Sequence, residues 1–157
     1  MKNNSLIPPN SHDLKNVERL CTWERPYQKP EAYEVLFAKA MYEIIDWHRK
    51  RSSFYARFLE NKKFDLTKWS GDLTEIPFIV ANFFKQHEVK SVPEKEISLH
   101  LTSSGTMGQK SQIFFDNWSI GCAQQMVDFI FKDYNWISSM PVNYLLYSYQ
   151  SEKGSKL

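Results

Sequence analysis

Two short runs with the pattern of β-strands lie at residues 97–101 and 112–116, on either side of a loop of small and hydroxyl residues. In the first run apolar and polar residues alternate from Ile97 to Leu101, which is the period of a strand with one face turned inward. The second run, QIFFD, has the composition of a return strand. The two runs predict a β-hairpin, and any function of the loop must be compatible with a position between two strands.

The loop, TSSGTMGQKS at 102–111, contains every residue type that a phosphate-binding loop requires. Gly105 and Gly108 allow positive φ and a close approach of the backbone, so that successive N–H groups can converge on an anion. Hydroxyl groups and one mobile positive charge come from Thr102, Ser103, Ser104, Thr106 and Lys110. The alternative is a hairpin loop rich in turn formers, because Ser, Gly and Thr favour turns for local reasons. On composition alone the two interpretations stay open.

Other known motifs do not fit the chain. Counted from Gly105, the second glycine of a P-loop would fall on Lys110, and a strand follows the loop where a P-loop opens a helix. The dinucleotide pattern G-x-G-x-x-G needs a third glycine that is missing here. The histidines and cysteines show none of the close spacings of a preformed metal site, so no protein metal site is expected.

The chain before the hairpin is predicted to be mostly helical. Residues 1–29 contain several prolines and little periodicity, so we expect an amino-terminal arm there. Over 31–47 apolar residues recur at spacings of three and four, which predicts a long amphipathic helix. The basic cluster HRKRSS at 48–53 suits a solvated helix end rather than an anion site. A second helix is expected over Phe54–Asn61 and a short one over Ala81–Gln86.

After the hairpin, Asp116 or Asn117 can cap a helix that extends to Tyr134. The run VNYLLYSYQ at 142–150 is rich in β-branched and aromatic residues and predicts a buried strand. The last three residues, SKL at 155–157, match a peroxisomal address signal. The alternative is that this match is an accident of where the chain stops.

Composition excludes several classes of function. The 157 residues are 42% hydrophobic, which suits one domain with a packed core. A formal charge of +2 gives no strong field, so neither nucleic acid nor an anionic membrane is an expected partner. No apolar run approaches the roughly 18 residues of a membrane span. Cys21 and Cys122 lie far apart with no signal sequence ahead of them, which favours a reducing, cytoplasmic setting and thiols that pack in the core.

The loop TSSGTMGQKS resembles the phosphate loop of adenylate-forming enzymes, usually written T-S-G-T-T-G-x-P-K. Together with YARFLE, EIPFIVANFFKQHEV and YLLYSYQ, it is similar to the acyl-protein synthetase (LuxE-type) family, from about Glu31 to the end. The resemblance implies an α/β enzyme, of which this stretch would be α+β: helices, a strand–phosphate loop–strand hairpin, a helix and a core strand. Residues 30–157 would form part of the amino-terminal domain, truncated at its carboxy-terminal end.

The resemblance also implies an activity. ATP and a carboxylic acid, a fatty acid in this family, form an acyl-adenylate and pyrophosphate, and a thiol on an acyl-accepting or reductase protein then takes the acyl group. By motif position the loop residues would hold the β- and γ-phosphates of ATP, with Mg²⁺ sharing their charge and Lys110 neutralising part of it. Met107 and the missing proline before the lysine depart from the family pattern. No adenine motif or catalytic lid is found, so we expect a fragment that is inactive alone.

Two other interpretations remain from the residues alone. One is a non-catalytic α+β binding or scaffold protein, with the aromatic-rich helices at 33–47 and 120–134 as its partner surface. The other is a different nucleotide-binding hydrolase. Cys122 is predicted to be buried by its helical spacing, which makes it a poor acyl acceptor.

Overall fold

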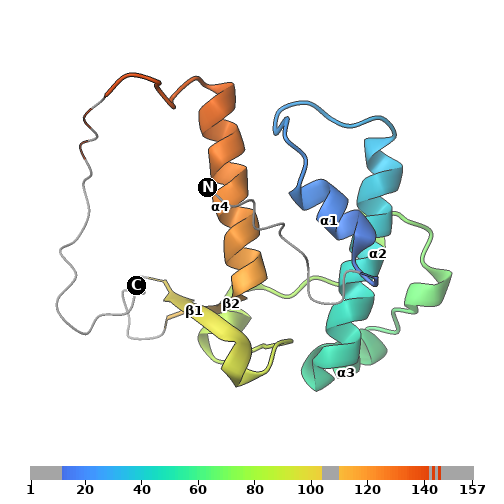
Figure 1. Ribbon diagram of the computed structural model, residues 1–157. Coiled ribbons are helices and arrows are strands. Elements are labelled where there is room, and N and C mark those ends of the chain that lie inside the picture. Colours follow the sequence, from blue (N-terminus) through green and yellow to red (C-terminus); the bar gives the residue numbers. More distant parts are fainter. Residues whose placement is uncertain (1–11, 104–109, 142, 144, 146–157) are drawn as a thin grey trace.

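The computed structural model describes residues 12–103, 110–141, 143 and 145. In this part of the chain three α-helices precede a β-hairpin and a fourth follows it (Figure 1). The helices are α1 (Lys15–Cys21), α2 (Tyr33–Arg51), α3 (Ser53–Asn61) and α4 (Asn117–Asp133), and the strands are β1 (Ile97–Thr102) and β2 (Gln112–Asp116). Short 3-10 helices connect α3 to β1 at Leu66–Lys68, Leu73–Glu75, Ala81–Lys85 and Glu94–Glu96. No helix among the described residues has the length and apolar character that a bilayer crossing requires.

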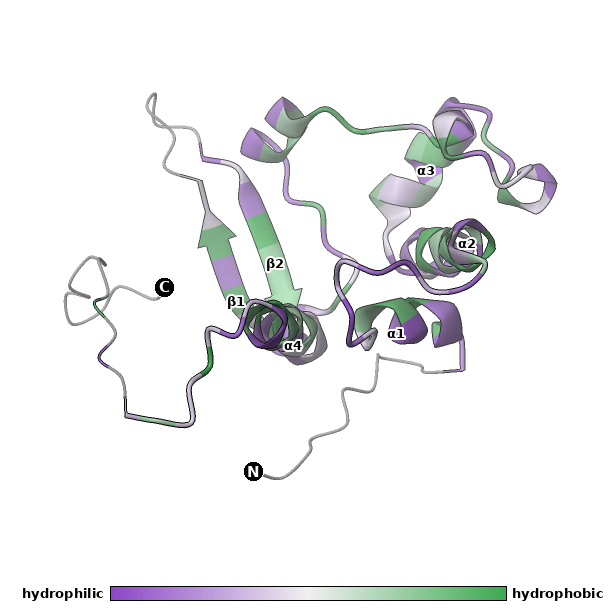
Figure 2. Cartoon of the chain, turned by 90° about the horizontal axis from the view of Figure 1, so that it is seen from above, coloured by the Kyte–Doolittle hydropathy of each residue, from purple (hydrophilic) through white to green (hydrophobic). Residues whose placement is uncertain are grey.

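The helices α1 to α3 lie on one side of the molecule and the hairpin on the other, as Figure 2 shows from above. β1 and β2 pair antiparallel, with Leu99 opposite Phe115 and Thr102 opposite Gln112. α4 begins directly where β2 ends and rises from the base of the hairpin (Figure 1). The described part is therefore mostly helical and α+β, as expected for this stretch, and its strand pairing is not the parallel pairing of an α/β sheet.

The predicted elements over 33–61 and 97–134 are confirmed, with small shifts at their ends. The break between α2 and α3 lies at Ser52, whose hydroxyl oxygen accepts a hydrogen bond from the N–H of Tyr55. Asp116, one of the two predicted caps, starts α4 and accepts a hydrogen bond from the N–H of Ser119 at 2.8 Å. The strand predicted at 142–150 lies outside the described residues except for positions 143 and 145, which are not in a strand. The SKL tripeptide is also outside them.

The best-packed part of the core lies between α2 and α3. Ile45, Leu59 and Leu66 are each no more than 3% exposed and pack against one another. Partly buried side chains surround this cluster: Met41, Ile44, Tyr55, Phe58, Phe64, Trp69 and Ile76. Because burial of apolar surface stabilises by about 25 cal/mol per Å², this cluster fixes α3 and the following connection against α2.

Residues 15–21 form a helix, where the weak periodicity of the sequence predicted an arm. α1 packs along α2, and Leu14 ahead of it is 1% exposed. The carboxylate of Glu43 in α2 accepts hydrogen bonds from the backbone N–H groups of Asn16 and Val17, at 2.7 and 3.1 Å. These N–H groups belong to the first helical turn and have no partner within their own helix. α1 is therefore stabilised by its contact with α2, which a periodicity argument cannot detect.

α3 and α4 end in the same hydrogen-bonded motif. After α3, Lys63 adopts a left-handed φ of 54° and donates its N–H to the carbonyl of Glu60 at 2.9 Å. Phe64 then donates its N–H to the carbonyl of Leu59 at 3.0 Å. Together these bonds form a Schellman motif, which satisfies the last carbonyls of a helix. α4 ends in the same way, with Asn135 at the left-handed position.

Candidate functional site

The two ends of the predicted phosphate loop are held together where the hairpin strands end. Thr102 and Gln112 are the last residue pair of the sheet. One step further, the N–H of Ser103 donates to the carbonyl of Ser111 at 3.0 Å. The N–H of Ser111 in turn donates to the hydroxyl oxygen of Ser103 at 2.9 Å. Ser103 therefore closes the neck of the loop with both its backbone and its side chain.

Only some of the predicted phosphate-loop residues can be placed. Thr102, Ser103 and Lys110 are exposed at the same end of the hairpin. Within the described ranges Lys110 has no ion-pair partner, so its charge is not neutralised there by a carboxylate. The remaining predicted residues lie outside the described part of the chain: Ser104, Gly105, Thr106 and Gly108.

The inward face of the hairpin is covered only in part. Leu99 is partly buried, as the alternation predicted. Leu101, predicted on the same inward face, is 42% exposed. The reason is position: α4 rises from the opposite end of the hairpin (Figure 1), so Leu101 lies near the loop and away from that helix. The loop end of the hairpin is therefore the open end.

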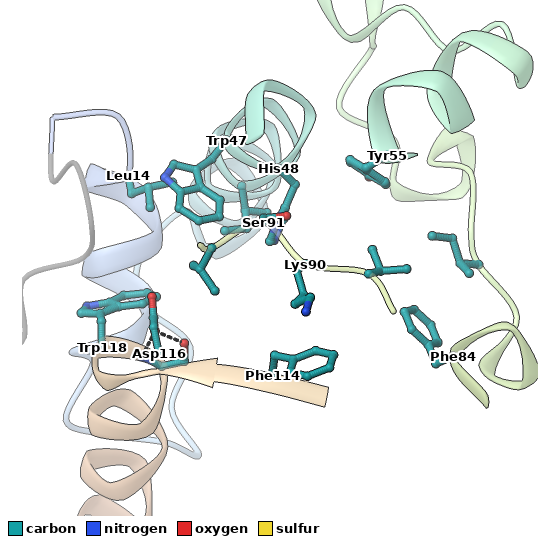
Figure 3. Close-up of a pocket in the computed structure, with 15 residues that line it drawn as sticks. Leu14, Trp47, His48, Tyr55, Phe84, Lys90, Ser91, Phe114, Asp116 and Trp118 are labelled. Carbon is teal, nitrogen blue, oxygen red and sulfur yellow. Dashed lines mark hydrogen bonds between the residues drawn. The ribbon is translucent and has the colours of Figure 1, made fainter. Parts of the chain in front are cut away.

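A cavity of about 490 Å³ lies between β2 and the helices. Its walls come from α2, from the connection that precedes β1, from β2 and from the start of α4 (Figure 3). Most of the lining side chains are apolar or aromatic: Leu14, Ile44, Trp47, Tyr55, Ile79, Phe84, Val89, Val92, Phe114 and Trp118. A cavity of this size, mostly apolar with a few polar groups, is typical of a small-molecule site.

One polar pair stands at the wall of this cavity. Nδ1 of His48 and the hydroxyl oxygen of Ser91 are 2.7 Å apart (Figure 3). Burial lowers the pKa of His48, and the nearby charge of Arg51 lowers it further. The imidazole is therefore neutral near pH 7. Among the described residues no carboxylate orients the ring, so the pair lacks the third group of a nucleophilic triad.

Lys90 also reaches the cavity, but its charge is already paired. Its Nζ lies 2.8 Å from a carboxylate oxygen of Glu94 and 2.9 Å from one of Glu88. It also lies 4.8 Å from the ring centre of Phe114. Hydrogen bonds to Glu94 and Glu88 raise the pKa of Lys90. With Lys90 paired and His48 neutral, the cavity suits an apolar group better than a phosphate.

The described residues do not form a metal site. Within them, no group of three or more histidine, cysteine or carboxylate side chains is placed to hold a metal ion. A Mg²⁺ that accompanies a nucleotide keeps several waters and binds chiefly to the phosphates. We therefore assign no step to a protein-held Mg²⁺.

Sequence reasoning did not find this cavity. It placed His48 in a solvated basic cluster, whereas the ring is half-buried, with its centre 5.1 Å from the ring of Trp47. Ser91 was not singled out, because the two residues of the pair are 43 positions apart. The available signal was helical phase: Ile44, Trp47 and His48 are spaced to share one face of α2.

A comparison with protein families bears on the interpretations that the sequence left open. The acyl-protein synthetase family, LuxE, matches residues 11–142, which is most of the chain. The chain belongs to the LuxE family. No curated protein and no solved structure matches it.

LuxE-family proteins are acyl-protein synthetases, which activate fatty acids with ATP. The match confirms the resemblance as far as residue 142, and the segment YLLYSYQ, which the resemblance also included, lies beyond it. The match begins at residue 11 and so includes α1, ahead of the point near Glu31 where the resemblance was first placed. LuxE membership favours the enzyme over the non-catalytic scaffold protein and over an unrelated hydrolase.

Proposed function

We propose that this chain supplies the phosphate-binding loop of an ATP-dependent acyl-activating ligase. A carboxylate oxygen of the substrate attacks the α-phosphorus of ATP, which forms an acyl-adenylate and releases pyrophosphate. A thiol then attacks the acyl carbon, and AMP leaves. The expected substrate is a long-chain fatty acid, the expected acceptor is the thiol of a partner protein such as a reductase, and the expected compartment is the cytoplasm.

The loop residues would act on the departing pyrophosphate. Negative charge grows on its oxygens as the bond to the α-phosphorus breaks, and donors that are already in place stabilise this charge. Backbone and hydroxyl donors would come from Thr102, Ser103, Ser104, Gly105, Thr106 and Gly108. Lys110 adds a full positive charge, and Mg²⁺ carried by ATP neutralises part of the same charge.

The observation that carries the proposal is the closed neck of the loop in a segment that the family match includes. Ser103 and Ser111 fix the two ends of the loop relative to each other. A loop with fixed ends has less conformational freedom to lose when it closes on a ligand. The neck therefore supports a preorganised site, which electrostatic stabilisation of a transition state requires.

The apolar cavity beside β2 is where we expect the acyl chain to lie. Phe114 lines this cavity and lies on the strand that leads directly out of the loop. The proposed phosphate site and the apolar site thus lie along one short strand. Each CH₂ group removed from water contributes about 0.8 kcal/mol, so the cavity favours a long chain over a short carboxylic acid.

Fatty-acid-dependent exchange between ATP and pyrophosphate tests the proposal, with the complete reading frame that contains this chain. Lys110→Ala is expected to lower the exchange rate by about 10²- to 10³-fold, as for other lost charge-stabilising donors. Gly105→Val is expected to abolish exchange, because a branched side chain prevents close approach of the backbone to phosphate.

The matched control is Lys95→Ala. Lys95 is an exposed lysine in the short helix ahead of β1, away from the loop, and its removal should leave exchange unchanged. Exchange that survives both loop substitutions at the wild-type rate would show that the loop takes no part in the reaction.

A further inference from the structure

A second cavity, of about 610 Å³, lies where α1, the connection after it, the first turns of α2 and one side of α4 meet. Both cysteines of the chain line it, Cys21 as the last residue of α1 and Cys122 in the second turn of α4. Aromatic and sulfur-containing side chains, among them Phe37, Met126 and Phe129, form much of its wall. The sequence gives no hint of this meeting, since the two cysteines are far apart and lack a close spacing.

Cys21 and Cys122 line the same cavity and lie close enough for their thiols to influence each other's pKa. Both residues are half-buried, so Cys122 is not the fully buried residue that its helical spacing predicted. A disulfide requires the two sulfur atoms to approach to a bond length of about 2.05 Å. Two thiols that line one cavity and influence each other are placed to form this bond.

This interaction makes the two thiols chemically different. The hydrogen bond from Cys122 lowers the pKa of Cys21 to about 7, against the opposing effect of burial. The pKa of Cys122 is raised by the same interaction, by burial and by the nearby carboxylates of Asp116 and Glu18. Near neutral pH Cys21 is thus partly a thiolate, the form that attacks disulfides, while Cys122 keeps its proton.

We propose that Cys21 and Cys122 form a redox-active dithiol that closes reversibly to a disulfide between α1 and α4. A small disulfide such as glutathione disulfide serves as the oxidant. The Cys21 thiolate attacks one of its sulfurs and releases one glutathione thiolate. Cys122 then gives up its proton and attacks the Cys21 sulfur, which releases the second glutathione. Two electrons pass from the protein dithiol to the oxidant, and two glutathione thiols are formed.

The position of the bond gives it a structural consequence. α1 lies on the side of α2 that faces α4 (Figures 1 and 2), and Glu43 already ties it to α2. α4 continues directly from β2, the strand that leads out of the loop. Tyr27, which follows α1, and Tyr134, which follows α4, also meet across the seam between α1 and α4, with their ring centres 5.5 Å apart and their rings edge-on. A disulfide would add a covalent bond at this seam.

Oxidation of the purified full chain with glutathione disulfide tests the proposal, followed by alkylation, digestion and mass spectrometry. We expect a peptide pair joined through Cys21 and Cys122, in a monomer whose thermal midpoint rises by about 10 °C, because the bond closes a long loop. Dithiothreitol should reverse both changes. In Cys122→Ser we expect Cys21 to carry glutathione instead, in Cys21→Ser we expect Cys122 to stay largely reduced, and in neither variant should the thermal midpoint rise.

Phenylarsine oxide, which binds two neighbouring thiols at once, gives a second readout that needs no oxidation. We expect one arsenic per reduced wild-type chain and none that survives washing in either single variant. Two freely alkylated thiols after oxidation, separate glutathione adducts on both cysteines, or disulfide-linked dimers alone would overturn the proposal. None of these outcomes depends on ATP or fatty acid, so the test is independent of the proposed enzyme activity.

Discussion

Asn16 at the start of α1 is held to Glu43 of α2 by two hydrogen bonds. Its backbone nitrogen lies 2.7 Å from one carboxylate oxygen of Glu43, and its side-chain amide nitrogen lies 2.5 Å from the other. A carboxylate placed at the first turn of a helix satisfies free N–H groups and interacts favourably with the helix dipole. This contact anchors a short helix that would be marginal by itself.

Replacement of this carboxylate should therefore destabilise the fold. We expect Glu43→Ala to lower the free energy of unfolding by about 1–3 kcal/mol, the range for hydrogen bonds to a charged group. Urea denaturation followed by circular dichroism measures this change. The control Glu34→Ala removes an exposed carboxylate from the first turn of the same helix, where it pairs with Lys29, and its effect should be smaller, at most about 1 kcal/mol. Equal effects of the two substitutions would contradict the role given to Glu43.

Lys63 offers a stabilising substitution. It occupies the left-handed position of the Schellman motif after α3, where glycine has no steric cost. Lys63→Gly should raise the free energy of unfolding by about 1 kcal/mol, the order of the left-handed penalty for a side chain. Its neighbour Lys62 has a right-handed, helical backbone, so Lys62→Gly should destabilise instead. The same sign for both variants in urea denaturation would be evidence against this assignment of the helix end.

His48 should make stability depend on pH. Its pKa in the folded state lies below the ordinary value of 6.5, chiefly through burial. As pH falls below 6.5 the unfolded chain takes up a proton before the folded one, so the free energy of unfolding decreases. Above pH 6.5 this contribution is fully present. Thermal midpoints between pH 8 and 5 should fall less steeply in His48→Gln than in wild type.

The control for this prediction is His100→Gln. His100 is exposed on β1 and stacks on Phe114. The substitution His100→Gln should therefore leave the dependence of the thermal midpoint on pH as it is in wild type. If the pH profile of the thermal midpoint changes in His100→Gln but not in His48→Gln, the pH dependence does not come from His48.

The cavity beside β2 can be tested by filling it. Val89 lines this cavity and is only partly buried, so Val89→Phe should be tolerated by the fold while it occupies space that an acyl chain needs. We expect the affinity for a long-chain fatty acid to fall at least tenfold, which corresponds to about 1.4 kcal/mol. Displacement of a fluorescent fatty acid from the chain measures this affinity. Val80→Phe, at an exposed position with 59% of its surface accessible, should have no effect, and identical binding by both variants would exclude the cavity as the acyl site.

Several elements of this fold were determined by local sequence signals. The spacing of apolar residues in 33–47 predicted α2, and the alternation in 97–101 predicted β1. Asp116 was predicted as a cap, and it caps α4. These signals work from sequence because each depends on residues a few positions apart, whose geometry is fixed by the periods of helix and strand. The resemblance to the family likewise came from a short ordered set of segments.

Only the tertiary structure brought together residues that are distant in the chain. Glu43 accepts hydrogen bonds from the free N–H groups of α1, His48 lies beside Ser91 at the wall of a cavity, and Cys21 lies near Cys122 at the seam between α1 and α4. No pattern in the local sequence encodes such meetings. They depend on how whole helices pack to remove apolar surface from water, and packing is a property of the complete set of contacts rather than of any one segment.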